Sequence, residues 1–104
     1  MESIDKLKKL SIKTLENKRY SLLTNNMDYC YLCGKIKNHK HEIFYGKNRK
    51  NSMIYGMVIP LCNKCHDLVH NNITLDNKLK KEAQVIFEEY YDIDFLSIFR
   101  KNYK

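Results

Sequence analysis

Two matched pairs of cysteines constrain the fold of this chain more than any other feature of its sequence. Cys30 and Cys33 form one Cys-x-x-Cys pair, and Cys62 and Cys65 form the other. Each pair can present two thiolates to one ion, and two such pairs complete a tetrahedral site. A chain of 104 residues buries a modest core, so a structural metal would add stability that the core lacks. We therefore expect one structural zinc ion bound by the four cysteines.

The second cysteine pair leads directly into two histidines. His66 follows Cys65, and His70 comes four positions later. On a helix, side chains at this spacing face the same way, so both imidazoles could reach a single metal ion. The other histidines of the chain are His39 and His41. We expect His39 to be exposed or to face phosphate.

A second chemistry also fits part of this segment. Residues 62–66 read Cys-Asn-Lys-Cys-His, which is the attachment pattern of a c-type haem. Covalent haem proteins are exported, however, and residues 1–6 begin no apolar signal segment. A haem would also leave Cys30 and Cys33 without a role, so zinc is the better interpretation.

The basic charge of the chain is concentrated beside the cysteines. The formal net charge is +7, and residues 35–66 contain seven Lys or Arg against one acid, Glu42. Lys47, Arg49 and Lys50 lie close together in this stretch and suit the phosphates of DNA. No apolar run approaches the ~20 residues that span a bilayer, and four cysteines without a secretion signal indicate reduced thiols. We expect a soluble cytoplasmic protein that binds DNA and no membrane.

Hydrophobic periodicity predicts a single α+β domain over residues 1–104, in three parts. Residues 1–27 would form an amphipathic helix over 3–17, capped by Ser3, and a short strand over 20–23. Residues 28–71 would form a metal knuckle at 29–34, strands at 41–44 and 57–61 joined by a basic loop over 46–52, and a metal-bearing helix. Residues 72–104 would form a helical scaffold. Its inward positions are expected to be Leu79, Ala83, Ile86 and Tyr90, in a helix that starts at Thr74 or Asp76, and Phe95, Ile98 and Phe99 after Asp94.

Over about residues 28–71 this arrangement resembles the HNH nuclease family, whose ββα-metal finger is often framed by two Cys-x-x-Cys pairs that bind structural zinc. The family pattern has an acid or His followed by a His on the first strand, an Asn near the second strand, and one or two His on the helix. Here His41-Glu42, Met57 and His66/His70 fall in those places. The resemblance implies a small zinc-stabilised ββα-metal (HNH) finger with flanking helices.

Two positions depart from the family pattern. Glu42 takes the place where the family usually has its base histidine, and with an ordinary pKa of about 4.3 it is a weaker base near neutrality. His41 is the alternative base. Met57 takes the place of the asparagine, and it can neither hydrogen-bond a histidine nor bind a hard metal ion well. Asn48 or Asn51 could replace that asparagine from the loop.

The resemblance extends beyond the finger. The run over residues 41–46, with Asn48-Arg49-Lys50 and Ser52, is similar to small HNH proteins encoded by phages and prophages, and so is the tail over residues 94–103. This similarity implies an origin in a phage or mobile element, and hence the cytoplasm of a bacterial host cell.

The activity that the resemblance implies is hydrolysis of DNA phosphodiester bonds with one divalent ion, Mg²⁺, Mn²⁺, Ni²⁺ or Zn²⁺. His41, His66 and His70 would bind that ion, and Glu42 or His41 would activate water. The basic loop over residues 46–52 would hold the DNA backbone. Because the backbone carries no sequence code, weak specificity is expected.

Two functions from other classes compete with this one. A zinc nucleobase deaminase needs His-x-Glu and Pro-Cys-x-x-Cys, but His41-Glu42 lacks the intervening residue and Leu61 interrupts the second motif. The stronger alternative keeps the fold and the zinc but only binds nucleic acid, or a host or phage protein, and Glu42 and Met57 favour it. The sequence leaves open the oligomeric state, the DNA structure recognised, and nicking against double-strand cleavage.

Overall fold

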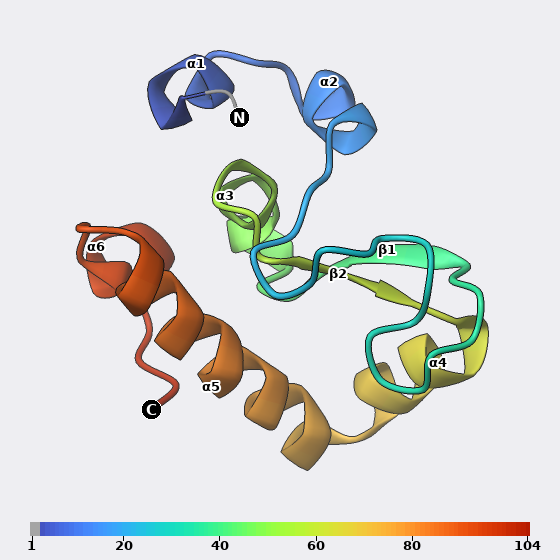
Figure 1. Cartoon of the computed structure of the whole chain (residues 1–104). Coiled ribbons are helices and arrows are strands. Elements are labelled where there is room, and N and C mark those ends of the chain that lie inside the picture. The colour runs from blue at the N-terminus through green and yellow to red at the C-terminus, as the bar shows by residue number, and fades with distance from the viewer. Residues whose placement is uncertain (1–2) are drawn as a thin grey trace.

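The described residues form a two-stranded antiparallel hairpin surrounded by helices (Figure 1). The computed structural model describes residues 3–104, so Met1 and Glu2 of the predicted N-terminal part lie outside it. The helices are α1 (Ile4–Lys8), α2 (Ile12–Asn17), the 3-10 helix η1 (Gly46–Asn48), α3 (Arg49–Ile54), α4 (Asn63–Asn71), α5 (Ile73–Tyr90) and α6 (Phe95–Phe99), and the strands are β1 (His39–Glu42) and β2 (Val58–Leu61). This architecture confirms the predicted α+β class.

The hairpin sets the two faces on which the candidate functional side chains lie. β1 pairs with β2 so that His41 is opposite Ile59 and Glu42 is opposite Val58. Since neighbouring side chains of a strand point to opposite faces, His39 and His41 share one face of β1 and Glu42 lies on the other. The pairing confirms the existence of both predicted strands, but β1 spans residues 39–42 and not 41–44, and β2 starts at residue 58 and not 57.

The connection between the strands is helical, and the basic loop predicted over residues 46–52 is wrong. η1 leads directly into α3, whose inward side buries Ser52, Met53 and Ile54. Ser52 Oγ accepts a hydrogen bond from Phe44 N (3.1 Å) and donates one to Phe44 O (2.6 Å), which fixes the end of β1 against α3. The sequence did not predict this helix because residues 46–51 carry mainly polar side chains. The buried residues of α3 come only after them.

The N-terminal part consists of two short helices in place of the single helix predicted over residues 3–17. Ser3 caps α1 as expected, because its side chain accepts a hydrogen bond from Lys6 N. Ser11 then accepts a hydrogen bond from Thr14 N and starts α2 as a separate helix. The break was missed because the apolar spacing continues across it, while a second serine cap interrupts the backbone.

The strand predicted over residues 20–23 is absent from the described part of the chain. Leu22 N donates one hydrogen bond to Gly56 O (2.9 Å), and the Tyr20 hydroxyl donates to Ile54 O (2.6 Å). Gly56 has a φ of 74°, and a Cβ there would lie 2.7 Å from the Tyr20 ring. Residues 20–22 therefore pack closely on the turn after α3. The backbone hydrogen bond between Leu22 and Gly56 is not continued into a β-ladder.

Helix α5 is the longest element and begins earlier than predicted. Asn72 Oδ1 accepts a hydrogen bond from Leu75 N (3.1 Å), so the helix starts at Ile73 and not at Thr74 or Asp76. Figure 1 shows it running from the end of α4 to α6. No helix among residues 3–104 is long and apolar enough to cross a membrane.

An aromatic core lies between the hairpin, α5 and α6. Leu79 and Ala83 of α5 are buried as predicted and Ile86 is half-buried, but Phe87 takes the place expected for Tyr90, which is 55% exposed. In α6, Phe95 and Phe99 are buried as predicted, and Ile98 is half-buried. The rings gathered here are those of Phe44, Tyr55, Phe87, Phe95 and Phe99. The prediction of a buried Tyr90 is wrong because Phe87, one helical turn earlier, already fills the core.

Candidate metal sites

The four cysteines come together from two turns at one end of the hairpin. Cys30 and Cys33 lie in the turn over residues 29–34, where Gly34 has a φ of 79° and its N–H donates to Cys30 O (2.9 Å). Cys62 is the N-cap of α4, and Cys65 lies in the first turn of that helix. The clustering confirms that the two Cys-x-x-Cys pairs belong to one site.

The distances between the sulfur atoms suit one tetrahedral metal ion. All four Sγ atoms lie within 4.8 Å of one another, and Cys33 Sγ is 3.6 Å from Cys62 Sγ. Zinc–sulfur bonds of about 2.3 Å at tetrahedral angles place sulfurs about 3.8 Å apart. The cysteines are free thiols, so the cluster suggests a structural zinc site and not disulfides.

Local hydrogen bonds favour thiolates at two of these positions. Burial raises the pKa of Cys30, but backbone N–H groups, first that of Cys62, outweigh it and bring the pKa down to about 6. The backbone N–H of Cys65 lowers the pKa of Cys62. Burial and the neighbouring thiols raise the pKa of Cys65 instead, because sulfurs this close cannot all be charged without a cation among them. A divalent ion would remove that conflict.

A second cluster is formed by three histidines from β1 and α4. His41 lies on the strand, and His66 and His70 lie one turn apart on the helix. One ring nitrogen of each lies within 4.8 Å of the other two, and His66 Nε2 is 3.1 Å from His70 Nε2. Metal–nitrogen bonds of about 2.0–2.1 Å at tetrahedral angles place nitrogens about 3.3 Å apart. Three ligands would leave a coordination position open, unlike the closed four-cysteine set.

His41 is the buried member of the histidine cluster. It is 4% exposed, and its Nε2 has no hydrogen-bond partner among the described residues. Burial and the nearby His66 and His70 lower the pKa of His41 to about 4, and burial likewise lowers the pKa of His66. Both imidazoles are therefore neutral near neutral pH, which is the form that binds a metal ion. An unpaired buried nitrogen is unfavourable, and a bound cation would satisfy it.

His39 supports this cluster without belonging to it. Its ring stacks on that of His66, with centroids 4.1 Å apart and planes 15° apart. His39 Nε2 lies 2.6 Å from Asn63 Oδ1, and Asn63 N donates to Asn38 Oδ1 (2.9 Å). Half-buried His39 therefore holds His66 from the side, at the junction of the hairpin and α4.

Glu42, predicted as a base, lies on the face of β1 opposite to His41. Its carboxylate is 2.9 Å from Arg49 Nε and 3.4 Å from Arg19 Nη2. Both arginines also form ion pairs with Glu16. Two glutamates and two arginines thus form one ion-pair network on the face of β1 that carries Glu42. The structure therefore gives Glu42 two guanidinium partners and does not bring it into the histidine cluster.

The basic residues predicted to contact DNA have different surroundings. Lys47 in η1 and Lys50 in α3 are exposed. Arg49 lies between them in sequence, but its guanidinium is engaged by Glu16 and Glu42. Of the three, the two lysines are therefore the ones open to a phosphate backbone.

The positions related to the family asparagine also lie away from the histidines. Met57 is 0% exposed, within the core. Asn48 Nδ2 donates to Phe99 O (3.0 Å), and Asn51 Nδ2 donates to Ile98 O (3.2 Å). Both asparagines thus satisfy carbonyl groups at the end of α6, so neither supplies the missing amide to the cluster.

The sequence did not predict a cluster of three polar side chains beside the histidines, formed by Tyr45, Asp76 and Lys80. The Tyr45 hydroxyl donates to Asp76 Oδ2 (2.7 Å), and Lys80 Nζ donates to the same oxygen (2.9 Å). The hydrogen bond with Asp76 raises the pKa of Tyr45. The only available signal was the spacing of Asp76 and Lys80, one turn apart on a helix, and that spacing equally fits a solvent-exposed pair.

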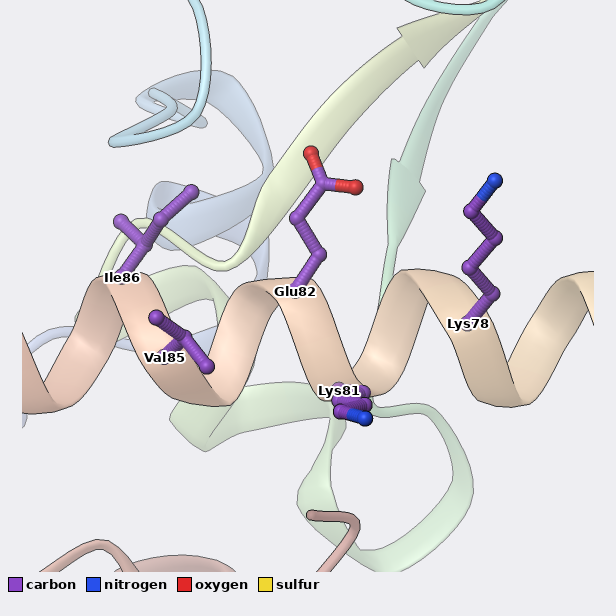
Figure 2. Close-up of a pocket in the computed structure, with 5 residues that line it drawn as sticks. All are labelled: Lys78, Lys81, Glu82, Val85 and Ile86. Atoms are coloured by element: carbon purple, nitrogen blue, oxygen red, sulfur yellow. The ribbon is translucent and has the colours of Figure 1, made fainter.

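A shallow pocket on α5 is separate from both clusters. The residues that line it, drawn in Figure 2, are Lys78, Lys81, Glu82, Val85 and Ile86. None of them is a cysteine or a histidine, and Glu82 accepts a hydrogen bond from the Tyr31 hydroxyl. The pocket therefore brings no metal-binding side chains together.

Comparisons with known proteins do not assign the chain to a family. No family model, no curated protein and no solved structure matches it. Its class therefore rests on its own geometry: a small α+β domain with four cysteines clustered as for a structural zinc ion, and three histidines that form a second candidate metal site.

Proposed function

We propose that this protein is a metal-dependent endonuclease of the HNH type that hydrolyses DNA phosphodiester bonds. The observation that carries the proposal is the convergence of His41 with His66 and His70 on one point. A hairpin followed by a helix, with histidines on the first strand and on the helix, agrees with the resemblance of residues 28–71 to the HNH family. That resemblance also underlies the proposed origin in a phage or mobile element and the bacterial cytoplasm as its place of action.

The histidine cluster supplies the chemistry in this proposal. A divalent ion held there would stabilise negative charge developing on a phosphate and lower the pKa of a bound water, so no separate carboxylate is required. His41 is buried, His66 is half-buried and His70 is exposed. The cluster is therefore accessible to solvent on the side of α4. Glu42 anchors Arg19 and Arg49 behind β1. In this proposal it is a structural residue.

Exposed lysines supply the attraction to DNA. The formal net charge of the chain is +7, and Lys47 and Lys50 are exposed at the start of the connection between the strands. Ammonium groups neutralise phosphates without reading bases. The proposed nuclease therefore binds DNA with weak sequence specificity.

Cleavage of supercoiled plasmid tests the proposal. Wild-type protein supplied separately with magnesium, manganese, nickel or zinc should produce nicked or linear DNA. His70→Ala removes one of the three ligands and should abolish cleavage, whereas Asn71→Ala, an exposed neighbour on the same helix, should retain it. Both variants should keep the zinc of the four-cysteine site. Supercoiled and single-stranded DNA left intact by the wild type with all four metals would contradict the nuclease function.

A second function is favoured by two specific observations. Glu42 is bound by two arginines, and Met57 is buried in the core, so neither position offers the groups that the family pattern uses. The alternative is a protein that keeps the fold and the structural zinc and binds nucleic acid, or a host or phage protein, without cutting. Salt-sensitive DNA binding without cleavage by any of the four metals would favour this alternative.

A further inference from the structure

An exposed aromatic ring lies beside the histidine cluster. The Tyr45 ring centroid is 5.8 Å from that of His70 and 6.2 Å from that of His41. Tyr45 is nevertheless 44% exposed, although it follows directly on residues 43 and 44, which are buried. The chain thus presents a large ring to solvent at the edge of a candidate metal site.

Two buried charged residues of α5 hold this ring in place. Asp76 is 2% exposed and Lys80 is 9% exposed, and Asp76 Oδ2 accepts hydrogen bonds from both the Tyr45 hydroxyl and Lys80 Nζ. Lys80 Nζ also lies 4.2 Å from the Tyr45 ring centroid. A buried ion pair adds little net stability over apolar residues of similar size. Its clear local effect is to fix the orientation of an exposed tyrosine.

The hydroxyl of Tyr45 is not the group that is offered to a ligand. It already donates to Asp76, so it is not free to exchange a proton at the histidines. Lys80 Nζ lies over one face of the ring, so the opposite face is the one left for a ligand. A rigid exposed ring near a phosphate site can stack on a nucleobase, and such stacking tolerates any base because every base has a π face.

We propose that Tyr45 is a stacking platform for an unpaired nucleotide next to the phosphate that occupies the histidine cluster. This inference rests on the proposed nuclease function and deepens it by naming the class of substrate: DNA with an unpaired base at the cleavage site, as in single strands, frayed ends or flaps. In an intact duplex both faces of a base are already stacked, and freeing one requires unpairing. Tyr45 is therefore a specificity-determining residue, and Asp76 and Lys80 are positioning residues.

Binding measured separately from cleavage tests this inference. The probes are a fluorescent single strand of about 16 nucleotides and a duplex of the same sequence, titrated with zinc-loaded full-length protein by anisotropy. Gels run after each titration verify that the probes remain intact. The wild type should bind the strand more tightly than the duplex. Tyr45→Ala should weaken binding of the strand by about 5- to 100-fold, the range for loss of one stacked base, and leave binding of the duplex unchanged.

Tyr45→Phe is the matched control, because it keeps the ring and loses only the hydroxyl. It should bind the strand more tightly than Tyr45→Ala and at most about threefold more weakly than the wild type, since the ring face remains while the hydrogen bond to Asp76 that helps to orient it is lost. Unchanged binding of the strand by Tyr45→Ala overturns the inference and leaves the nuclease function standing. Should Tyr45→Ala fail to fold, the wild type still decides, because equal affinity for strand and duplex overturns the inference by itself. Absence of any DNA binding by the wild type overturns the proposed function together with this inference.

Discussion

Loss of one cysteine ligand should release the turn over residues 29–34 while the aromatic core stays folded. Cys33→Ser replaces a thiolate by a hydroxyl, which is a poor zinc ligand. Apart from Cys30, which is buried, and half-buried Tyr31, which packs against the core, the residues of the turn are exposed, and Leu32 is 37% exposed. The rings of the aromatic core come from elsewhere in the chain, chiefly from α5, α6 and the end of β1. We therefore expect local unfolding of the turn and not loss of the whole fold.

The loss of stability of the turn can be estimated from the contribution of one zinc ligand and from the backbone hydrogen bonds of the turn. A structural zinc site contributes about 10–16 kcal/mol, or about 2.5–4 kcal/mol for each of four ligands if divided equally. The amides of Cys30, Tyr31 and Gly34 donate three hydrogen bonds that close the turn and tie it to β2. At about 1 kcal/mol net each, the three bonds together stabilise the turn by about as much as one zinc ligand does. Loss of that ligand should therefore be enough to let the turn open. Since about 1.4 kcal/mol is a factor of ten, exchange of these amides should speed up about 60- to 700-fold.

Hydrogen-exchange mass spectrometry provides the measurement. Peptides from residues 27–37 should lose protection in Cys33→Ser, while peptides from residues 79–87 in α5 should keep it. Ile36→Ser is the control, because Ile36 lies just after the turn and is 74% exposed, so it should exchange like the wild type and retain zinc. If Cys33→Ser protects residues 30–34 as the wild type does, the reasoning is refuted.

Three further predictions concern the hairpin and the charges around it. Ser52→Ala leaves a buried N–H and C=O at the end of β1 unpaired and should lower the free energy of unfolding by about 2–4 kcal/mol, whereas the exposed Ser97→Ala should change it by less than about 0.5 kcal/mol in the same denaturant titration. Glu42→Gln should slow cleavage by less than about tenfold, because its carboxylate is held by two arginines; a loss of 100-fold or more, the size expected for a general base, would return that role to Glu42. DNA affinity should fall steeply between about 50 and 200 mM salt, and Lys47→Gln should reduce the slope of log K against log salt by about one; an unchanged slope would remove Lys47 from the interface.

The two clusters could be predicted from the sequence because their signals are local. Cys-x-x-Cys and two histidines one helical turn apart fix the geometry of ligand pairs within a few residues. Joining those pairs into sites needed only the pairing of two short strands, which the sequence predicted near their observed positions. His41 meets His66 and His70, as the resemblance to the HNH family implied.

The remaining contacts depend on chain segments that are distant in sequence. The partners of Glu42 are Arg19 and Arg49, and nothing in the local pattern indicates that residue 19 passes behind β1. Tyr45 meets Asp76 only because α5 packs along the hairpin. Asn48 of η1 and Asn51 of α3 likewise donate to carbonyl groups of α6, contacts that no local pattern indicates. Tertiary contacts of this kind override local propensity.

Cys65 and His66 are consecutive residues of α4, yet their side chains belong to different clusters. Cys62 Sγ also accepts a hydrogen bond from Cys65 N (3.4 Å), so the sulfur site fixes where this helix begins. The start of α4 in turn determines where His66 and His70 meet His41. We therefore expect the two sites to be coupled through α4, so that an ion at the cysteines strengthens metal binding at the histidines. In a cell short of zinc, the histidine site would then bind its ion less tightly, even if that ion were a different metal.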